Sequence, residues 1–291
     1  MTAKEQILKR FPALSPTLQD AARFVVDHPN EVVISSMRTL AKRAHAQPAT
    51  LVRLAQQLGY SGWPELKSVF AEDLGLNTAR YGQRAKSLVA RGRHADLTGE
   101  MFAAQRQNLA STEPLCTASL GLAAKMLKRA KAVHVAGFRA SFPIAYSFVY
   151  GYRLFRNAVH LIDGQGGGLQ MQMRPIERRD AVVAISFAPY SREAIVVVEE
   201  AKAAGALVIA LTDSNASPLA LSADLPVLFS VASPSFFPSV AAAVAVTEAL
   251  LELLVADAGP AAVEQIDRAE QNLFESGAYL QPRAKRQTSR S

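Results

Sequence analysis

Residues 37–60 constrain the fold of this chain more than any other segment. Apolar residues recur there in two short stretches, at the three- and four-residue spacing of one helix face. They are Leu40, Ala41 and Ala44 in the first stretch and Leu51, Leu54, Ala55 and Leu58 in the second. His45 stands where a tight turn needs a left-handed residue, and Pro48 suits the first position of a helix. With Gly59 as the C-terminal cap, the segment predicts a helix-turn-helix.

The exposed face of the second predicted helix carries side chains that can contact DNA. A helix-turn-helix places its second helix in the major groove, where arginine to guanine is the commonest specific contact. We therefore expect DNA contacts from Arg38, Gln47, Pro48, Ala49, Thr50, Arg53, Gln56 and Gln57. A plain helical hairpin with a solvated polar face has the same spacing, so the pattern alone leaves both interpretations open.

Composition is that of an ordinary globular protein. The 291 residues suggest two domains, and 49% of them are hydrophobic. The most apolar predicted helix, residues 240–256, contains Glu248 and Glu252 and is short for a membrane span. The chain starts without an apolar run, and its single cysteine, Cys116, excludes an internal disulfide framework. We expect a cytoplasmic protein with no membrane contact.

Charge is distributed unevenly along the chain. Residues 1–110 carry 15 Lys and Arg against 9 Asp and Glu, whereas residues 111–280 carry 13 against 16. Residues 281–291 add four basic groups and no acid. A basic first third on a slightly acidic remainder is typical of a DNA-binding domain joined to a sensing domain.

From residue 115 onward, short β-branched runs alternate with helical patterns. The predicted strands are residues 132–136, 158–162, 181–186, 207–212 and 226–230. The predicted helices are residues 120–131, 142–155, 169–174, 191–204, 217–223 and 240–256. Continuous apolar strands that alternate with helices indicate an α/β doubly wound parallel sheet, covered on both faces.

The carboxyl ends of these strands are where such a sheet binds ligands. We expect effector contacts there from Gly137, Arg139, Ser141, Gly164, Ser186, Tyr190 and Ser191. Hydroxyls and backbone N–H groups at helix N-termini suit an anion such as phosphate, although serines also cap helices routinely. Residues 164–168 are either a phosphate-holding nest or a flexible loop, and Asp213 is expected to stabilise its own turn.

The two halves together resemble a known family. The helix-turn-helix followed by LGYSGWPELK (58–67) resembles the N-terminal domain of RpiR-type bacterial transcriptional regulators. Residues 115–256 resemble the sugar isomerase (SIS) domain of these regulators, in Gly-x-x-x-Ser at 137–141, the serine loop at 186–191 and Thr-Asp-Ser-x-x-Ser-Pro-Leu at 212–219. The resemblance implies a homodimer or homotetramer, palindromic operators near carbohydrate genes and a phosphosugar-like effector. We expect neither a cofactor nor a metal ion.

The chain departs from that family at several positions. His45 and Gln47 replace the usual Gly and Ser of the turn, and Arg139 replaces the second Gly of the first loop. Ala188 and Pro189 remove a hydroxyl and an N–H from the sugar-phosphate loop. Arg139 either compensates with a bidentate anion contact or occludes the pocket. The residues Phe187, Tyr190, Phe236 and Phe237 either line a more apolar pocket or serve packing.

Two other functions are considered. A sugar-phosphate isomerase needs a positioned base, but His134 and His160 lie inside predicted strands, and Glu193 and Glu248 have no evident partner. A dinucleotide-binding protein needs a second glycine that GFRAS (137–141) lacks. We therefore predict a regulator and no enzyme. Its predicted parts are the helix-turn-helix domain at 1–76, a partly helical linker at 77–112, the effector domain at 113–258, a C-terminal helix at 259–280 and a disordered basic tail at 281–291.

Overall fold

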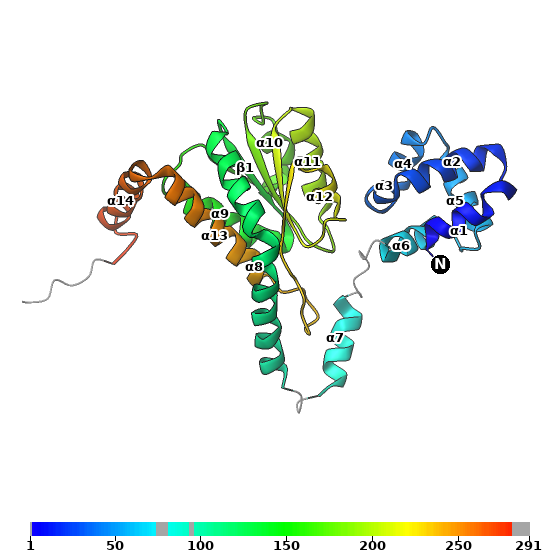
Figure 1. Cartoon of the computed structure of the whole chain (residues 1–291), viewed down its shortest axis with the longest axis horizontal. Helices are drawn as coiled ribbons and strands as arrows, with labels where there is room; N and C mark the ends of the chain where they lie inside the picture. Colours follow the sequence, from blue (N-terminus) through cyan, green and yellow to red (C-terminus); the bar gives the residue numbers. More distant parts are fainter. Residues whose placement is uncertain (1, 74–80, 93–95, 281–291) are drawn as a thin grey trace, which may run out of the picture.

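The computed structural model describes residues 2–73, 81–92 and 96–280. It contains a helical N-terminal unit, two connecting helices and a parallel sheet with helices around it (Figure 1). None of the described helices is long and apolar enough to cross a membrane. The predicted tail, residues 281–291, lies outside the described residues.

The N-terminal unit is all-helical, as the sequence predicts. Its helices are α1 (Ala3–Arg10), α2 (Pro16–Asp27), α3 (Pro29–Ile34), α4 (Met37–Arg43), α5 (Pro48–Gln57) and α6 (Trp63–Asp73). Proline occupies the first position of α2, α3 and α5, where its missing N–H costs nothing. The apolar faces of these helices meet in one core, in which Leu40, Leu51 and Leu54 are fully buried.

The connection to the sheet differs from the prediction. Helix α7 (Tyr81–Ala90) precedes α8 (Leu97–Arg129), a single helix of 33 residues that runs through Pro114. The predicted boundary at residues 112/113 therefore falls inside α8, which also includes most of the helix predicted at residues 120–131. Tertiary hydrogen bonds hold the helix there, because the Asn108 side-chain amide donates to the Ala232 carbonyl at 2.7 Å and the Ser230 N–H donates to Thr112 Oγ1 at 2.9 Å.

The sheet is parallel and covered on both faces. Its strands are β1 (Val133–Gly137), β2 (Val159–Ile162), β3 (Ala181–Ile185), β4 (Leu207–Thr212) and β5 (Leu225–Leu228), in the order β2-β1-β3-β4-β5. Its helices are α9 (Phe142–Arg153), α10 (Leu169–Met173), α11 (Arg192–Ala203), α12 (Pro218–Ser222) and α13 (Ala241–Ala258). Val183 packs toward α8, α9 and α13, whereas Val182 and Ala184 pack toward α10, α11 and α12. The doubly wound prediction is confirmed, with β5 beginning and ending slightly earlier than expected.

The C-terminal helix leaves this core. Gly259, with φ +65°, separates α13 from α14 (Pro260–Glu275). Helix α13 is buried against α8 and α9, but in the described part of α14 only Ala262 is buried. Helix α14 therefore projects from the sheet domain (Figure 1).

Candidate DNA-binding surface and effector site

The turn between α4 and α5 has the geometry that the sequence predicts. His45 has φ +50° and Gly59 has φ +97°, so both residues adopt the left-handed conformation expected of them. The Ala46 N–H donates to the Ala41 carbonyl at 2.9 Å and closes the turn. Among the described residues, the Gln47 side chain makes no capping hydrogen bond, so Pro48 and the turn alone define the start of α5.

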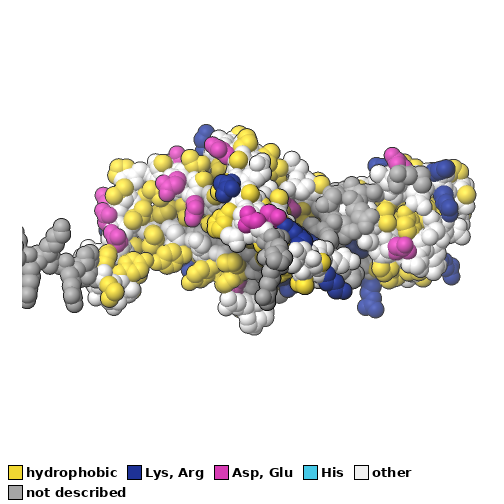
Figure 2. Space-filling view, turned by 90° about the horizontal axis from the view of Figure 1, so that it is seen from below, with side chains coloured by type: hydrophobic (Ala, Val, Ile, Leu, Met, Phe, Trp, Pro, Cys, Tyr) yellow, Lys and Arg dark blue, Asp and Glu magenta, His cyan; other side chains and the backbone are white. Residues whose placement is uncertain are grey.

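The residues expected to contact DNA lie on α4, the turn and α5. Of them, Arg38, Gln47, Ala49, Arg53, Gln56 and Gln57 are exposed, and Pro48 and Thr50 are half-buried. The opposite face of α5 is buried through Leu51, Leu54 and Ala55. In Figure 2, Lys and Arg side chains stand out from the end of the molecule that contains this helical unit. The surface is therefore polar, basic and accessible.

Two residues of α1 that the sequence did not single out anchor α5. The Gln6 side-chain amide donates to the Leu58 carbonyl at 2.8 Å, and Arg10 Nη1 donates to the Gln57 carbonyl at 2.7 Å. Both carbonyls lie at the C-terminal end of α5, where the last carbonyl groups of a helix have no N–H donor within the helix. Gln6 and Arg10 are four residues apart and so share one helix face, but only the tertiary fold shows what that face meets.

The loops that follow β1 and β3 lie side by side, because these strands pair. Ser141 and Ser186, at 4% and 2% exposure, bring buried hydroxyls to this edge. The loop after β1 turns tightly onto α9: a Cβ on Gly137 would lie 2.5 Å from Ala145 Cβ and 2.7 Å from the Ser141 carbonyl oxygen. Only glycine fits at position 137 without displacing its neighbours.

The 186–191 loop is held by side chains. Ser186 Oγ accepts the Ser191 N–H at 3.1 Å. Asp213, which follows β4, accepts the Tyr190 hydroxyl at 2.7 Å and the Ala188 N–H at 3.3 Å. Burial and the Asp213 carboxylate raise the pKa of Tyr190, so its hydroxyl stays protonated and donating. Asp213 thus fixes the neighbouring loop, a role that the sequence did not reveal.

Arg139 and Ser191 both bind Glu193, in the first turn of α11. Arg139, with φ +52°, donates to Glu193 Oε1 at 2.6 Å, and the Ser191 hydroxyl donates to Oε2 at 2.8 Å. The Glu193 backbone N–H, the Ser191 hydroxyl and the Arg139 charge hold the pKa of this carboxyl below its usual value. Ser191 also caps α11, because its Oγ accepts the Ala194 N–H. Glu193, for which the sequence showed no partner, therefore has two.

Gly164 lies on the other side of the β1 loop. It has φ +68°, and a Cβ there would lie 3.4 Å from the Phe138 ring. The N–H groups of Asp163 and Gly164 both donate to Gln172 Oε1, at 3.1 and 2.8 Å. Between the two interpretations of residues 164–168, the structure favours an ordered turn whose first N–H groups are already bound.

Several other residues that the sequence analysis considered do not meet at this edge. Phe187 packs edge-on against Phe229 in the core, and Phe237 contacts Tyr81 of α7, so these rings do not line one apolar pocket. His134 lies near the amino end of β1, where its ring bonds to Asp180 at 3.0 Å, far from the loops. Within the part of the chain that the structure describes, no three His, Cys, Asp or Glu side chains form a group that could hold a metal ion.

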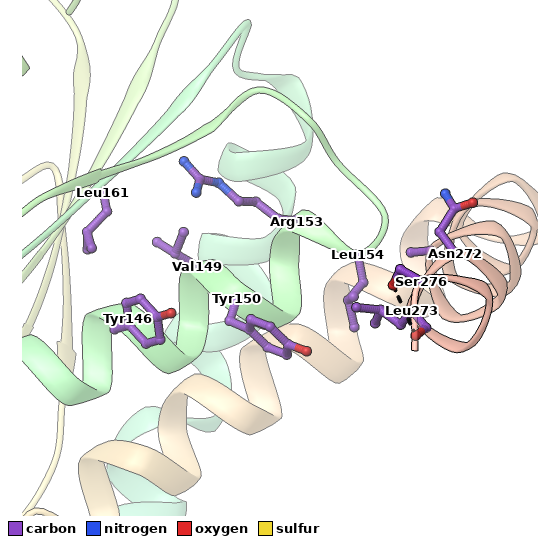
Figure 3. A pocket seen from close by; sticks show the side chains of 10 residues that line it. Tyr146, Val149, Tyr150, Arg153, Leu154, Leu161, Asn272, Leu273 and Ser276 are labelled. Atoms are coloured by element: carbon purple, nitrogen blue, oxygen red, sulfur yellow. Dashed lines mark hydrogen bonds between the residues drawn. The ribbon is translucent and has the colours of Figure 1, made fainter. Parts of the chain in front are cut away.

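A separate cavity of about 510 Å³ lies between α9, β2 and α14 (Figure 3). Tyr146, Tyr150 and Arg153 of α9 face it from one side, and Leu273 of α14 faces it from the other. None of the seven residues expected to bind the effector lines it. The cavity and the candidate effector site are therefore distinct.

Comparison with known proteins gives two family models that match in succession. The helix-turn-helix domain of the rpiR family matches residues 1–76, and the SIS domain matches residues 126–253. The HTH-type transcriptional regulator HexR of Pseudomonas aeruginosa is 28% identical over 224 residues, 76% of either chain. A regulator of Caldanaerobacter subterraneus, TTE0211, is 25% identical over 215 residues, 73% of this chain and 74% of that one.

Solved structures share the fold. The NanR protein of Vibrio vulnificus, complexed with ManNAc-6P, matches 96% of this chain and 100% of its own with a TM-score of 0.58 and 18% identity. The sugar isomerase domain of an RpiR transcription factor from Sphaerobacter thermophilus matches 64% of this chain and 100% of its own, with a TM-score of 0.55 and 23% identity. These likenesses support the assignment of both parts of the fold.

Proposed function

Because the chain belongs to the rpiR family of helix-turn-helix regulators that carry a SIS domain, we propose that α5 reads an operator in duplex DNA and that an anionic sugar-derived metabolite controls this binding. The observation that carries the proposal is the exposed polar face of α5, with Arg53 at its middle, backed by a buried apolar face. The chain is thus a transcriptional regulator, whose ligand and target genes are the proposed part.

On the DNA side, Arg53, Gln56 and Gln57 are the side chains that we assign to base edges. Arginine and glutamine make bidentate contacts with guanine and adenine in the major groove. Arg38, at the start of α4, is assigned to a phosphate, because the first helix of the motif crosses the DNA backbone. A homodimer or homotetramer would present two such surfaces to the half-sites of a palindrome.

On the metabolite side, we assign the ligand to the loops after β1 and β3. Ser141 and Ser186 supply hydroxyls, and Arg139 supplies a guanidinium that is exposed and paired with Glu193 alone among the described carboxylates. Such an exposed ion pair contributes only about 0.2–1 kcal/mol, so a phosphate that binds Arg139 in bidentate fashion displaces it readily. NanR of Vibrio vulnificus binds ManNAc-6P, which favours a phosphosugar as the class of ligand.

We propose that the SIS domain senses a metabolite and catalyses no reaction. Isomerisation needs a free base beside the substrate carbon. Glu193 is bound by Arg139 and Ser191, and Asp213 by Tyr190 and the Ala188 N–H. Both carboxylates therefore already hold the 186–191 loop and the start of α11, and neither is a free base.

The test of the DNA assignment is a mobility shift of the full chain on the duplex upstream of its own gene. We expect Arg53→Ala to weaken binding by about 1–3 kcal/mol, the value of a base contact. Arg174→Ala, an exposed arginine of the sheet domain, is the matched control and should leave binding unchanged. Equal binding by both variants would refute the role of Arg53.

A further inference from the structure

The helical N-terminal unit touches the sheet domain at α11 and α12. Helix α3 contacts α12, and Figure 1 shows α3 and α4 on the side of the unit that faces these helices. Ser36 and Thr39 of the α4 start enclose a cavity of about 80 Å³ together with Ile195 and Glu199 of α11. The contact is loose, because Ser36, Thr39 and Glu199 remain exposed and Ile195 is only half-buried.

This contact and the candidate effector site share one helix. Helix α11 begins at Arg192, directly after its cap Ser191, and its first turn carries Glu193, which is bound to Arg139. Two and six residues further along, the same helix presents Ile195 and Glu199 to the N-terminal unit. A helix moves as a rigid element, so a displacement of its first turn is transmitted to the contact with α4.

The contact also covers a part of the DNA-binding surface. The first helix of a helix-turn-helix crosses the DNA backbone, and here its start is formed by Ser36, Arg38 and Thr39. Ser36 and Thr39 face α11 across the cavity. A duplex that contacts the start of α4 therefore competes with α11 for Ser36 and Thr39.

Electrostatics weakens the docked arrangement. Lys67 Nζ donates to the Ser35 carbonyl at 2.9 Å, beside the cavity. Burial lowers the pKa of Lys67, and the positive charge of Arg192 at the start of α11 lowers it further. The like charges of Lys67 and Arg192 oppose docking, and the carboxylate of Glu199 in the same cavity lining offsets part of this repulsion.

We propose that docking of the α4 start against α11 is an autoinhibited state, in which DNA cannot reach α4, and that ligand at the first turn of α11 shifts the docked fraction. The inference rests on the proposed function, because it presupposes DNA binding by α4 and α5. The inference adds that the autoinhibited state forms within a single chain. It also adds that α11 connects the candidate effector site to the DNA-binding surface.

A cross-link across the cavity tests the docked state directly. Thr39→Cys and Glu199→Cys are combined in a Cys116→Ser background and treated with a short bis-maleimide, and binding to the upstream duplex is measured. We expect a cross-link within single chains and a loss of DNA affinity of about tenfold or more. The loss is measured against treated chains that carry Thr39→Cys alone, which account for modification of α4 itself, and treated chains that carry Glu199→Cys alone should bind as untreated protein does.

Opening the contact should have the opposite effect. Ile195→Lys adds a third positive charge beside Lys67 and Arg192, and we expect tighter binding to the duplex by about threefold or more. Val263→Lys adds the same charge at an exposed position of α14 and controls for non-specific attraction to DNA. Thermal unfolding of both variants establishes that they are folded.

The outcomes separate the two claims. Cross-linked chains that bind DNA normally, or a cysteine pair that fails to link while each single cysteine reacts, would overturn the autoinhibited state and leave DNA binding intact. Failure of the untreated parent chain to bind the duplex would overturn the proposed function and the inference with it.

Discussion

The Arg139 guanidinium donates to the Glu193 carboxylate at 2.6 Å and so joins the loop after β1 to the first turn of α11. The two residues are 54 positions apart and lie in the segments that follow the neighbouring strands β1 and β3. This pair occupies the place in which we assign the ligand's anionic group. It therefore makes Glu193 an internal competitor for Arg139.

Glu193→Gln should strengthen binding of inorganic phosphate by the full chain. Glutamine keeps the size of the side chain but loses the charge that holds Arg139, and an exposed ion pair of this kind corresponds to about threefold in affinity. Isothermal titration measures the effect. Glu200→Gln, exposed further along α11, is the control, and an unchanged or weaker affinity in Glu193→Gln would contradict the role of Glu193 as competitor.

Gly137→Ala should destabilise the sheet domain. The new Cβ would lie 2.5 Å from Ala145 Cβ, and overpacking of this kind costs about 1–3 kcal/mol. Urea unfolding of the full chain measures the loss. Gly121→Ala is the control, because a Cβ within that part of α8 meets nothing within 4 Å and alanine favours helices by about 0.5–1 kcal/mol. Equal stability of Gly137→Ala and the parent chain would contradict the close packing.

Asp180→Asn should destabilise the chain at neutral pH by about 2 kcal/mol, the usual loss for a broken buried charged hydrogen bond. Burial alone raises the pKa of Asp180. The Glu177 N–H, His134 and the Ala132 N–H outweigh this effect and hold that pKa below its usual value. A depressed carboxyl pKa stabilises the fold above the unfolded value of about 3.9, and the stabilisation is lost as the pH falls through the folded pKa.

The difference between Asp180→Asn and the parent chain should therefore shrink on acidification below about pH 4. Urea unfolding at neutral and acidic pH measures it, with Asp267→Asn on the exposed surface of α14 as the control. A difference that stays constant with pH would show that Asp180 acts through packing and not through its charge.

The spacing of residue types within short segments predicted the features that depend only on neighbouring residues. The left-handed turn at His45, the cap at Gly59 and the five strands follow from spacing and residue type within short windows, and the structure has them all. The single long helix α8 was not predicted, because bonds from Asn108 and Thr112 to residues more than 100 positions away hold it.

The site was predictable only in outline. That the serines gather at the carboxyl edge follows from parallel strands, so their placement was accessible from the sequence. The partners of Arg139, Tyr190 and Gly164 are Glu193, Asp213 and Gln172, and each pair depends on the loop geometry. No periodicity marks such pairs, because a side chain that reaches another loop leaves no signal in its own segment.

Regulation by a metabolite requires that a ligand of the sheet domain change DNA binding by the N-terminal unit. Fluorescence anisotropy of the labelled upstream duplex measures this change, when the duplex is titrated with the full chain in the presence of sugar phosphates and of their unphosphorylated parents. We predict that a sugar phosphate changes the duplex affinity by about 5- to 150-fold, the range of ordinary allosteric coupling, and that Arg139→Ala removes the change. A duplex affinity that no compound alters, together with turnover of one of the sugars, would contradict the claim.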